Sequence, residues 1–120
     1  MNCEIIIYQN PEGYIKIDVR LEEETVWLTQ EQMATLFGKA KSTINEHIKN
    51  IYEEKELVEL ATTKKFGNSE FQQKAPFYYN LDVIISVGYR VKSPQGTQFR
   101  IWATQRLKEY IIKENGKNKS

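Results

Sequence analysis

The stretch from residue 27 to residue 52, WLTQEQMATLFGKAKSTINEHIKNIY, constrains the fold more than any other part of this chain. It begins with Thr29 and, three residues later, Gln32, a pair typical of a helix N-terminus at which a hydroxyl and an amide side chain cap free backbone N–H groups. Gly38 comes directly after the apolar residues of this first helix. A glycine in the left-handed conformation commonly ends a helix at such a position. The pattern predicts a short helix that stops at this glycine.

A second helical periodicity resumes directly after the glycine. Its apolar residues recur at spacings of four and three, at Ile44, Ile48 and Ile51. Two helices with so short a link cannot lie antiparallel, so they must cross steeply. The stretch therefore predicts a helix-turn-helix over about residues 29–52, an arrangement whose second helix enters the DNA major groove.

The polar residues of the second helix share the face opposite the isoleucines, at Ser42, Asn45, Glu46 and Lys49. Ser and Asn can bond base edges, Lys can reach guanine or phosphate, and Glu can accept from cytosine N4. We assign Lys39 and Lys41 near the turn to phosphates and include Thr43 in the same surface. The alternative is an ordinary helical hairpin with a solvated polar face.

Ala40 departs from this pattern, because it lies where Ser, Thr or Asp often caps the second helix. Alanine offers no side-chain acceptor, at a cost of about 1 kcal/mol. The alternative is that Ser42 provides the cap and the helix starts later.

The residues before this stretch alternate as strands do. Residues 3–9 and 15–21 predict a hairpin around the turn at residues 10–13, and residues 25–28 predict a third strand. The acidic triplet at residues 22–24 predicts a solvated bend. We expect Trp27 to anchor the core instead of stacking on bases.

The residues after the second helix predict a wing over about residues 60–80. Leu57, Val58 and Leu60 are expected to finish the core, and residues 61–66 and 76–79 to form the strands of a long hairpin. Its lysines could contact phosphates or the minor groove, namely Lys64, Lys65 and Lys74. The alternative is a polar surface hairpin.

Two helices are predicted at the C-terminal end. Asn80 caps a helix over residues 81–91 in which Gly88 permits close approach of another element, and Ser93 and Pro94 start a helix over residues 94–114. Gly116 is expected to end it, leaving residues 117–120 as a tail or linker. We expect one domain over residues 1–116.

Charge is distributed unevenly although the net charge is +1. Residues 1–38 hold two basic and seven acidic side chains, a net charge of −5, and the remainder carries +6. This asymmetry is consistent with a nucleic-acid face beginning at the second helix. The single Cys3 fits a reducing cytoplasm, and no apolar run is long enough to span a membrane.

Several stretches together carry a resemblance to a known family: EIIIYQNPEG, IDVRLEEETVWLTQEQMATLFG, INEHIKNIYEEKEL and NLDVIISVGYRVKSPQGTQFRIWATQRLKEYIIK. They resemble the N-terminal domain of the RhuM family of virulence proteins. The spacing of Ser93, Phe99 and Trp102 is also similar to the Bro-N and KilA-N type domains of phage antirepressors. The resemblance implies a bacterial or phage-derived DNA-binding domain, often the front part of a longer protein.

Catalysis is not expected. His47 is the only histidine and Cys3 the only cysteine, so a zinc site is implausible, and no phosphate-binding loop or nucleophile motif is present. We expect no cofactor and no metal.

The sequence thus predicts an α+β, winged helix-turn-helix-like domain that binds double-stranded DNA specifically and regulates transcription. The alternative is an antirepressor-like module that binds another regulator through its aromatic-rich last helices. A homodimer would compensate for the few base pairs that one helix reads, although no residue identifies its interface. Further partners would be a C-terminal domain or a regulator protein.

Overall fold

The computed structural model of the chain describes residues 3–66 and 75–118, with side chains as far as residue 112 of the last helix. The fold is α+β. Five antiparallel strands form one sheet in the order β1-β2-β3-β5-β4. The strands are β1 Glu4–Gln9, β2 Lys16–Glu22, β3 Thr25–Leu28, β4 Thr63–Lys65 and β5 Phe77–Asn80. The helices are α1 Gln30–Phe37, α2 Lys41–Glu53, α3 Glu59–Thr62, α4 Leu81–Val91 and α5 Pro94–Asn118.

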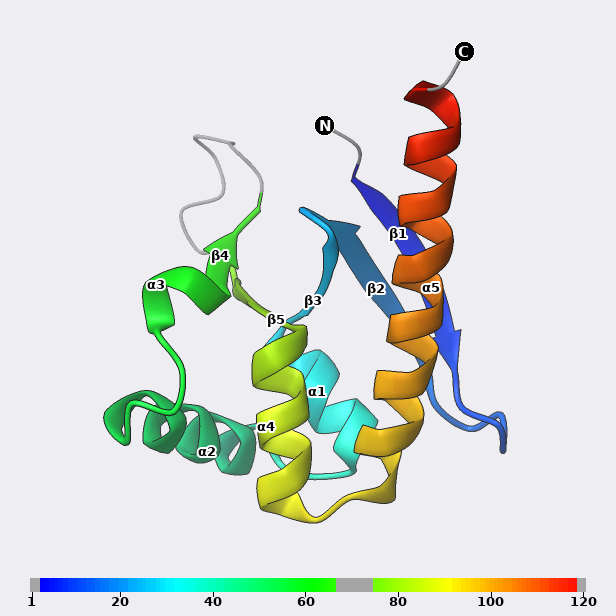
Figure 1. The fold of residues 1–120 in the computed structure, drawn as a ribbon. Helices are drawn as coiled ribbons and strands as arrows, with labels where there is room; N and C mark the ends of the chain where they lie inside the picture. The colour runs from blue at the N-terminus through cyan, green and yellow to red at the C-terminus, as the bar shows by residue number, and fades with distance from the viewer. Residues whose placement is uncertain (1–2, 67–74, 119–120) are drawn as a thin grey trace.

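The core lies between one face of the sheet and the helices (Figure 1). Alternate residues of β1 and β2 point into it, as expected for strands with one buried face. Tyr8 of β1 meets the rings of Phe99 and Trp102 of α5, with centroids 5.2 and 5.0 Å apart. α5 therefore packs beside β1, and α4 joins the core next to β3 and β5.

Trp27 lies on the other face of the sheet, where neighbouring residues cover it. Trp27 is 4% exposed, its indole N–H donates to the carbonyl of Glu22 at 2.9 Å, and the Phe66 ring packs edge-on against it. Trp27 is thus buried, as a core anchor should be, but it lies outside the main core cluster, on the other face of the sheet.

The acidic triplet forms a tight hairpin turn where a solvated bend was expected. Glu22 pairs with Thr25, so Glu23 and Glu24 make up the whole loop, with φ values of 56° and 61°. Two successive left-handed residues give the type I′ twist that suits a two-residue hairpin. Glutamate adopts this conformation less readily than glycine or asparagine, because its Cβ approaches the carbonyl oxygen.

Three of the predicted signals for helix ends are confirmed. Thr29 Oγ1 accepts from the Gln32 amide at 3.1 Å, and Gln32 Oε1 accepts from the Thr29 amide at 2.9 Å, which completes the capping box. Gly38 ends α1 with φ 65°. Asn80 Oδ1 accepts from the Val83 amide and caps α4.

The segment between α2 and β4 differs from the prediction. Residues 59–62 form the short helix α3 instead of the start of a strand, and Val58 and Leu60 are exposed instead of completing the core. The Tyr52 hydroxyl lies 2.9 Å from both Thr62 Oγ1 and Thr63 Oγ1 and ties this segment to α2. These hydrogen bonds join residues ten and eleven positions apart, so the local sequence does not indicate them.

The last helix is longer than predicted. α5 continues to Asn118, past the expected end near residue 114 and through Gly116, so the expected tail at residues 117–120 begins as helix. A glycine inside a helix costs about 1 kcal/mol relative to alanine and does not by itself end the helix. None of the helices in the described residues is long and apolar enough to cross a membrane.

Candidate nucleic-acid interface

α1 and α2 are separated by three residues, 38–40, and α2 lies across the direction of α4 (Figure 1). The isoleucines of α2 hold it against the core: Ile44 and Ile51 are fully buried and Ile48 is 3% exposed. Because these three residues occupy one side of the helix, the opposite side faces solvent.

The predicted contact residues of α2 lie on that solvent side. All four of the residues assigned to bases are exposed, namely Ser42, Asn45, Glu46 and Lys49. Thr43 is half-buried at the edge of this surface, and Lys39 is exposed in the link before it. α2 therefore presents a compact polar surface with hydrogen-bond donors, acceptors and cations side by side.

The start of α2 shows whether Ala40 or Ser42 is the N-cap residue of this helix. Ala40 is the N-cap residue and makes no side-chain hydrogen bond, and its carbonyl accepts from the amides of Thr43 and Ile44. The later start with Ser42 as the cap was wrong, because the helix already includes Lys41. The first amides of α2 thus lack a side-chain cap and remain available to an anion, as helix N-termini often are.

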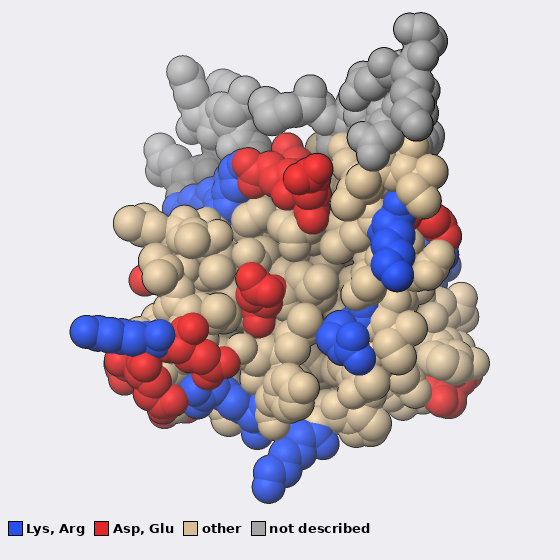
Figure 2. Space-filling model, viewed as in Figure 1, with Lys and Arg blue, Asp and Glu red and all other residues tan. Residues whose placement is uncertain are grey.

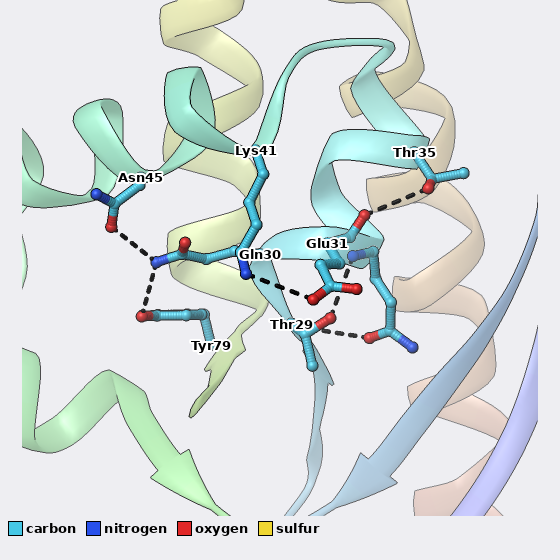
Figure 3. Close-up of polar contacts among 8 residues, drawn as sticks. Thr29, Gln30, Glu31, Thr35, Lys41, Asn45 and Tyr79 are labelled. Carbon is cyan, nitrogen blue, oxygen red and sulfur yellow. Dashed lines mark hydrogen bonds and ion pairs between the residues drawn. The ribbon is translucent and has the colours of Figure 1, made fainter. Parts of the chain in front are cut away.

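Lys41 reaches back to the first turn of α1. Its Nζ lies 3.4 Å from Glu31 Oε1, and both side chains are largely exposed (Figure 3). Such an exposed pair is worth at most about 1 kcal/mol, so a phosphate could replace the carboxylate. Lys39 and Lys49, by contrast, have no ion-pair partner among the residues that the structure describes.

The two described lysines of the predicted wing point in different directions. Lys64 Nζ lies 2.6 Å from Glu23 Oε2 at the β2–β3 turn, whereas Lys65 Nζ lies 4.7 Å from the centre of the Phe77 ring. Adjacent residues of a strand face opposite sides of the sheet, which explains the divergence. Lys74 lies outside the described residues.

A hollow of about 180 Å³ connects the β4–β5 hairpin with the helices. Its walls come from the α1 N-terminus, the start of α2 and strand β5, namely Thr29, Gln30, Glu31, Lys41, Pro76, Phe77 and Tyr79. Lys65 packs on the ring of Phe77, although it does not line the hollow itself. Lys64 is held instead at Glu23 of the β2–β3 turn.

Sequence reasoning did not single out Gln30 or Tyr79. Gln30 Nε2 donates to Asn45 Oδ1 and to the Tyr79 hydroxyl, each at 3.1 Å (Figure 3). Burial raises the pKa of the Tyr79 phenol above its usual value, so this hydroxyl stays protonated at neutral pH. No local motif marks such a contact, because its partners lie 15 and 49 residues away along the chain.

The surface over α4 and α5 has a different character. Over α4 and α5, Lys and Arg side chains are scattered among uncharged residues, and no continuous basic surface forms there (Figure 2). The aromatic residues of α5 turn inward: Phe99 is fully buried and Trp102 packs on Tyr8. Tyr89 of α4, in contrast, is 79% exposed, so an aromatic side chain of these last helices does face solvent.

Comparison with known proteins identifies the family. The sequence model of the Virulence protein RhuM family matches residues 55–116, more than half of the chain. The chain belongs to the RhuM family. No curated protein and no solved structure matches it.

The part of the chain matched by the RhuM family model begins just after α2. It runs through α3, the β4–β5 hairpin and α4 and includes most of α5. The candidate contact residues of α1 and α2 lie outside it.

Proposed function

We propose that this RhuM-family chain binds double-stranded DNA in a sequence-specific manner, with α2 in the major groove, and that it acts as a transcriptional regulator of bacterial or phage origin without catalysing a reaction. The observation that carries the proposal is the two-sided nature of α2. Its isoleucines fix it to the core, while Ser42, Asn45, Glu46 and Lys49 face solvent together. A rigid helix that projects groups able to bond base edges is the usual means of reading the major groove.

The arrangement around α2 supports a winged helix-turn-helix. β3 leads directly into α1 and α2, and β4 and β5 follow as a hairpin whose strand β5 pairs with β3. A hairpin in this position is suited to contact the DNA backbone beside the recognition helix. Lys41, which lines the hollow, and Lys65, which packs on Phe77, would then contact phosphates together with Lys39 and Lys49.

A titration with random-sequence duplex at several salt concentrations tests this proposal. Each lysine that neutralises a phosphate releases counterions, so log K falls linearly with log salt, by about 0.9 per contact. Lys39→Ala combined with Lys49→Ala should weaken binding and reduce the slope by about 1.8. The matched control is Lys16→Ala combined with Lys108→Ala, which removes the same charge from exposed positions on β2 and α5 and should leave the slope unchanged.

Two results would contradict the proposal. One is a folded protein that binds no duplex at low salt. The other is an equal loss of affinity in both double variants, which would indicate a general effect of net charge. In either case the α2 surface would be a solvated helix face.

A further inference from the structure

Gln30 connects three elements that are far apart in the sequence. It is the first residue of α1, and its side-chain nitrogen donates one hydrogen bond to Asn45 of α2 and one to Tyr79 of β5 (Figure 3). Both N–H groups of this amide are thereby used. The connection joins the candidate recognition helix to the hairpin through one side chain.

The position of Gln30 is itself well fixed. The capping box formed by Thr29 and Gln32 sets the start of α1, so the backbone at the residue between them is defined. Tyr79 is 6% exposed and belongs to β5, where it pairs with Leu28 of β3. One end of the hydrogen-bonded chain is thus anchored in the core, and its other end reaches the exposed surface of α2.

This connection determines which end of the Asn45 amide faces outward. Asn45 Oδ1 accepts the hydrogen bond from Gln30, so Nδ2 points away from Gln30 (Figure 3). An unrestrained asparagine on a recognition helix uses both ends of its amide to bind adenine, accepting from N6 and donating to N7. Here the accepting end is engaged within the protein, and the donating end remains for DNA.

We propose that Gln30 is a positioning residue that makes Asn45 a hydrogen-bond donor, so that this position of α2 selects guanine, whose O6 and N7 are adjacent acceptors on the major-groove edge. The inference rests on the proposed DNA binding. To that proposal the inference adds the side chain that sets the specificity, Gln30, and the base whose edge is selected, guanine.

Selection from a library of randomised duplexes tests the inference, because the enriched sequences themselves reveal the bases that each variant prefers. The wild-type protein should enrich a motif containing a guanine that Asn45→Ala no longer selects. In Gln30→Glu the new carboxylate can only accept, so it should bond Asn45 Nδ2 and turn Oδ1 toward the DNA. The preference at that position should then shift by about tenfold toward adenine or cytosine, which present amino groups, while the rest of the motif is retained.

Two further variants complete the design. Gln30→Ala frees the Asn45 amide and should reduce discrimination between guanine and adenine at that position to within a few-fold. Thr104→Glu adds the same charge as Gln30→Glu at an exposed position of α5 and should leave the motif unchanged. Thermal unfolding of each variant verifies that it is folded, and glutamate at the start of α1 is compatible with the helix dipole.

The possible failures are distinguishable. If the wild-type protein binds no duplex or enriches no motif, the proposed function is overturned and this inference with it. If the wild-type protein enriches a motif and both Gln30 variants enrich the same one, sequence-specific binding stands and the role of Gln30 is overturned. An adenine at the position read by Asn45 in the wild type would show that the amide has the opposite orientation and would also overturn the inference.

Discussion

Gly88 of α4 and Gly96 of α5 face each other so closely that a Cβ added to Gly88 would lie 3.3 Å from the Cα of Gly96. The same added atom would lie 3.3 Å from Cε1 of Phe37, at the end of α1. Three helices therefore meet at this point, and the missing side chains allow the contact. The predicted role of Gly88 in close approach is confirmed.

Replacement of Gly88 by valine should destabilise the fold. Its Cβ and methyl groups would press on the Gly96 backbone and the buried Phe37 ring, and overpacking of this kind costs about 1–3 kcal/mol. Urea unfolding followed by circular dichroism measures the change. Thr104→Val, at an exposed position of the same α5 helix, should change stability by less than about 0.5 kcal/mol. Equal effects of the two substitutions would show that the contact is looser than these distances indicate.

Glu24→Gly should stabilise the protein by about 1 kcal/mol, because glycine adopts a positive φ without the steric cost that glutamate incurs. Glu23 is left unchanged so that its ion pair with Lys64 is retained. Thermal unfolding measures the gain. The same substitution at Glu53, within α2, should have the opposite sign. A loss of stability in Glu24→Gly would mean that the turn does not hold two left-handed residues.

Glu56 should make stability depend on pH in the acid range. Its carboxylate accepts from Ser86 Oγ at 2.5 Å and from Arg90 at 2.9 Å, and these hydrogen bonds hold the pKa of Glu56 below its usual value of 4.5. A lowered pKa in the folded state contributes stability that is present above about pH 4.5 and is lost as the pH falls through the folded value.

The Glu56→Gln variant should therefore unfold more easily than the wild type at neutral pH, with the difference shrinking below about pH 4. Denaturant midpoints at pH 7 and pH 3 measure this change. Glu53→Gln, at an exposed position of α2, is the control and should not reproduce it. A difference that stays constant with pH would indicate that the Glu56 carboxylate does not titrate with a lowered pKa.

Glu31→Gln should tighten DNA binding if α2 is the contact surface. The substitution frees Lys41 from its ion pair and removes a negative charge next to the proposed phosphate positions. We expect a two- to fivefold gain at low salt, equivalent to up to about 1 kcal/mol for an exposed pair, and a smaller gain at high salt because screening weakens it. Glu12→Gln removes the same charge at the β1–β2 turn and serves as the control. Weaker binding by Glu31→Gln would place the DNA elsewhere.

The features that could be predicted from the sequence depend on local physics. Thr29 and Gln32 form a capping box within four residues, Gly38 supplies its own left-handed backbone, and the spacing of the isoleucines defines the buried side of α2. These preferences belong to short segments, and the packing of the rest of the chain agrees with them.

The features that could not be predicted depend on distant partners. Leu60 has the composition of a core residue and is 94% exposed, because hydrogen bonds from Tyr52 hold its segment as a short helix beside α2. Similarly, the pairing of Gln30 with Asn45 requires α1 and α2 to be docked at a defined angle. The sequence shows which residues of α2 face outward but not how a neighbouring side chain orients them.

The most direct test of the account is to map the DNA contact by NMR, following backbone amide shifts of the ¹⁵N-labelled protein as a random-sequence duplex is added at low salt. We predict that the largest changes occur between Lys39 and Lys49 and around Lys65, with the α4–α5 face between Lys92 and Arg100 little affected. Changes confined to that α4–α5 face, or no changes at all, would contradict the claim that α2 carries the DNA-binding surface.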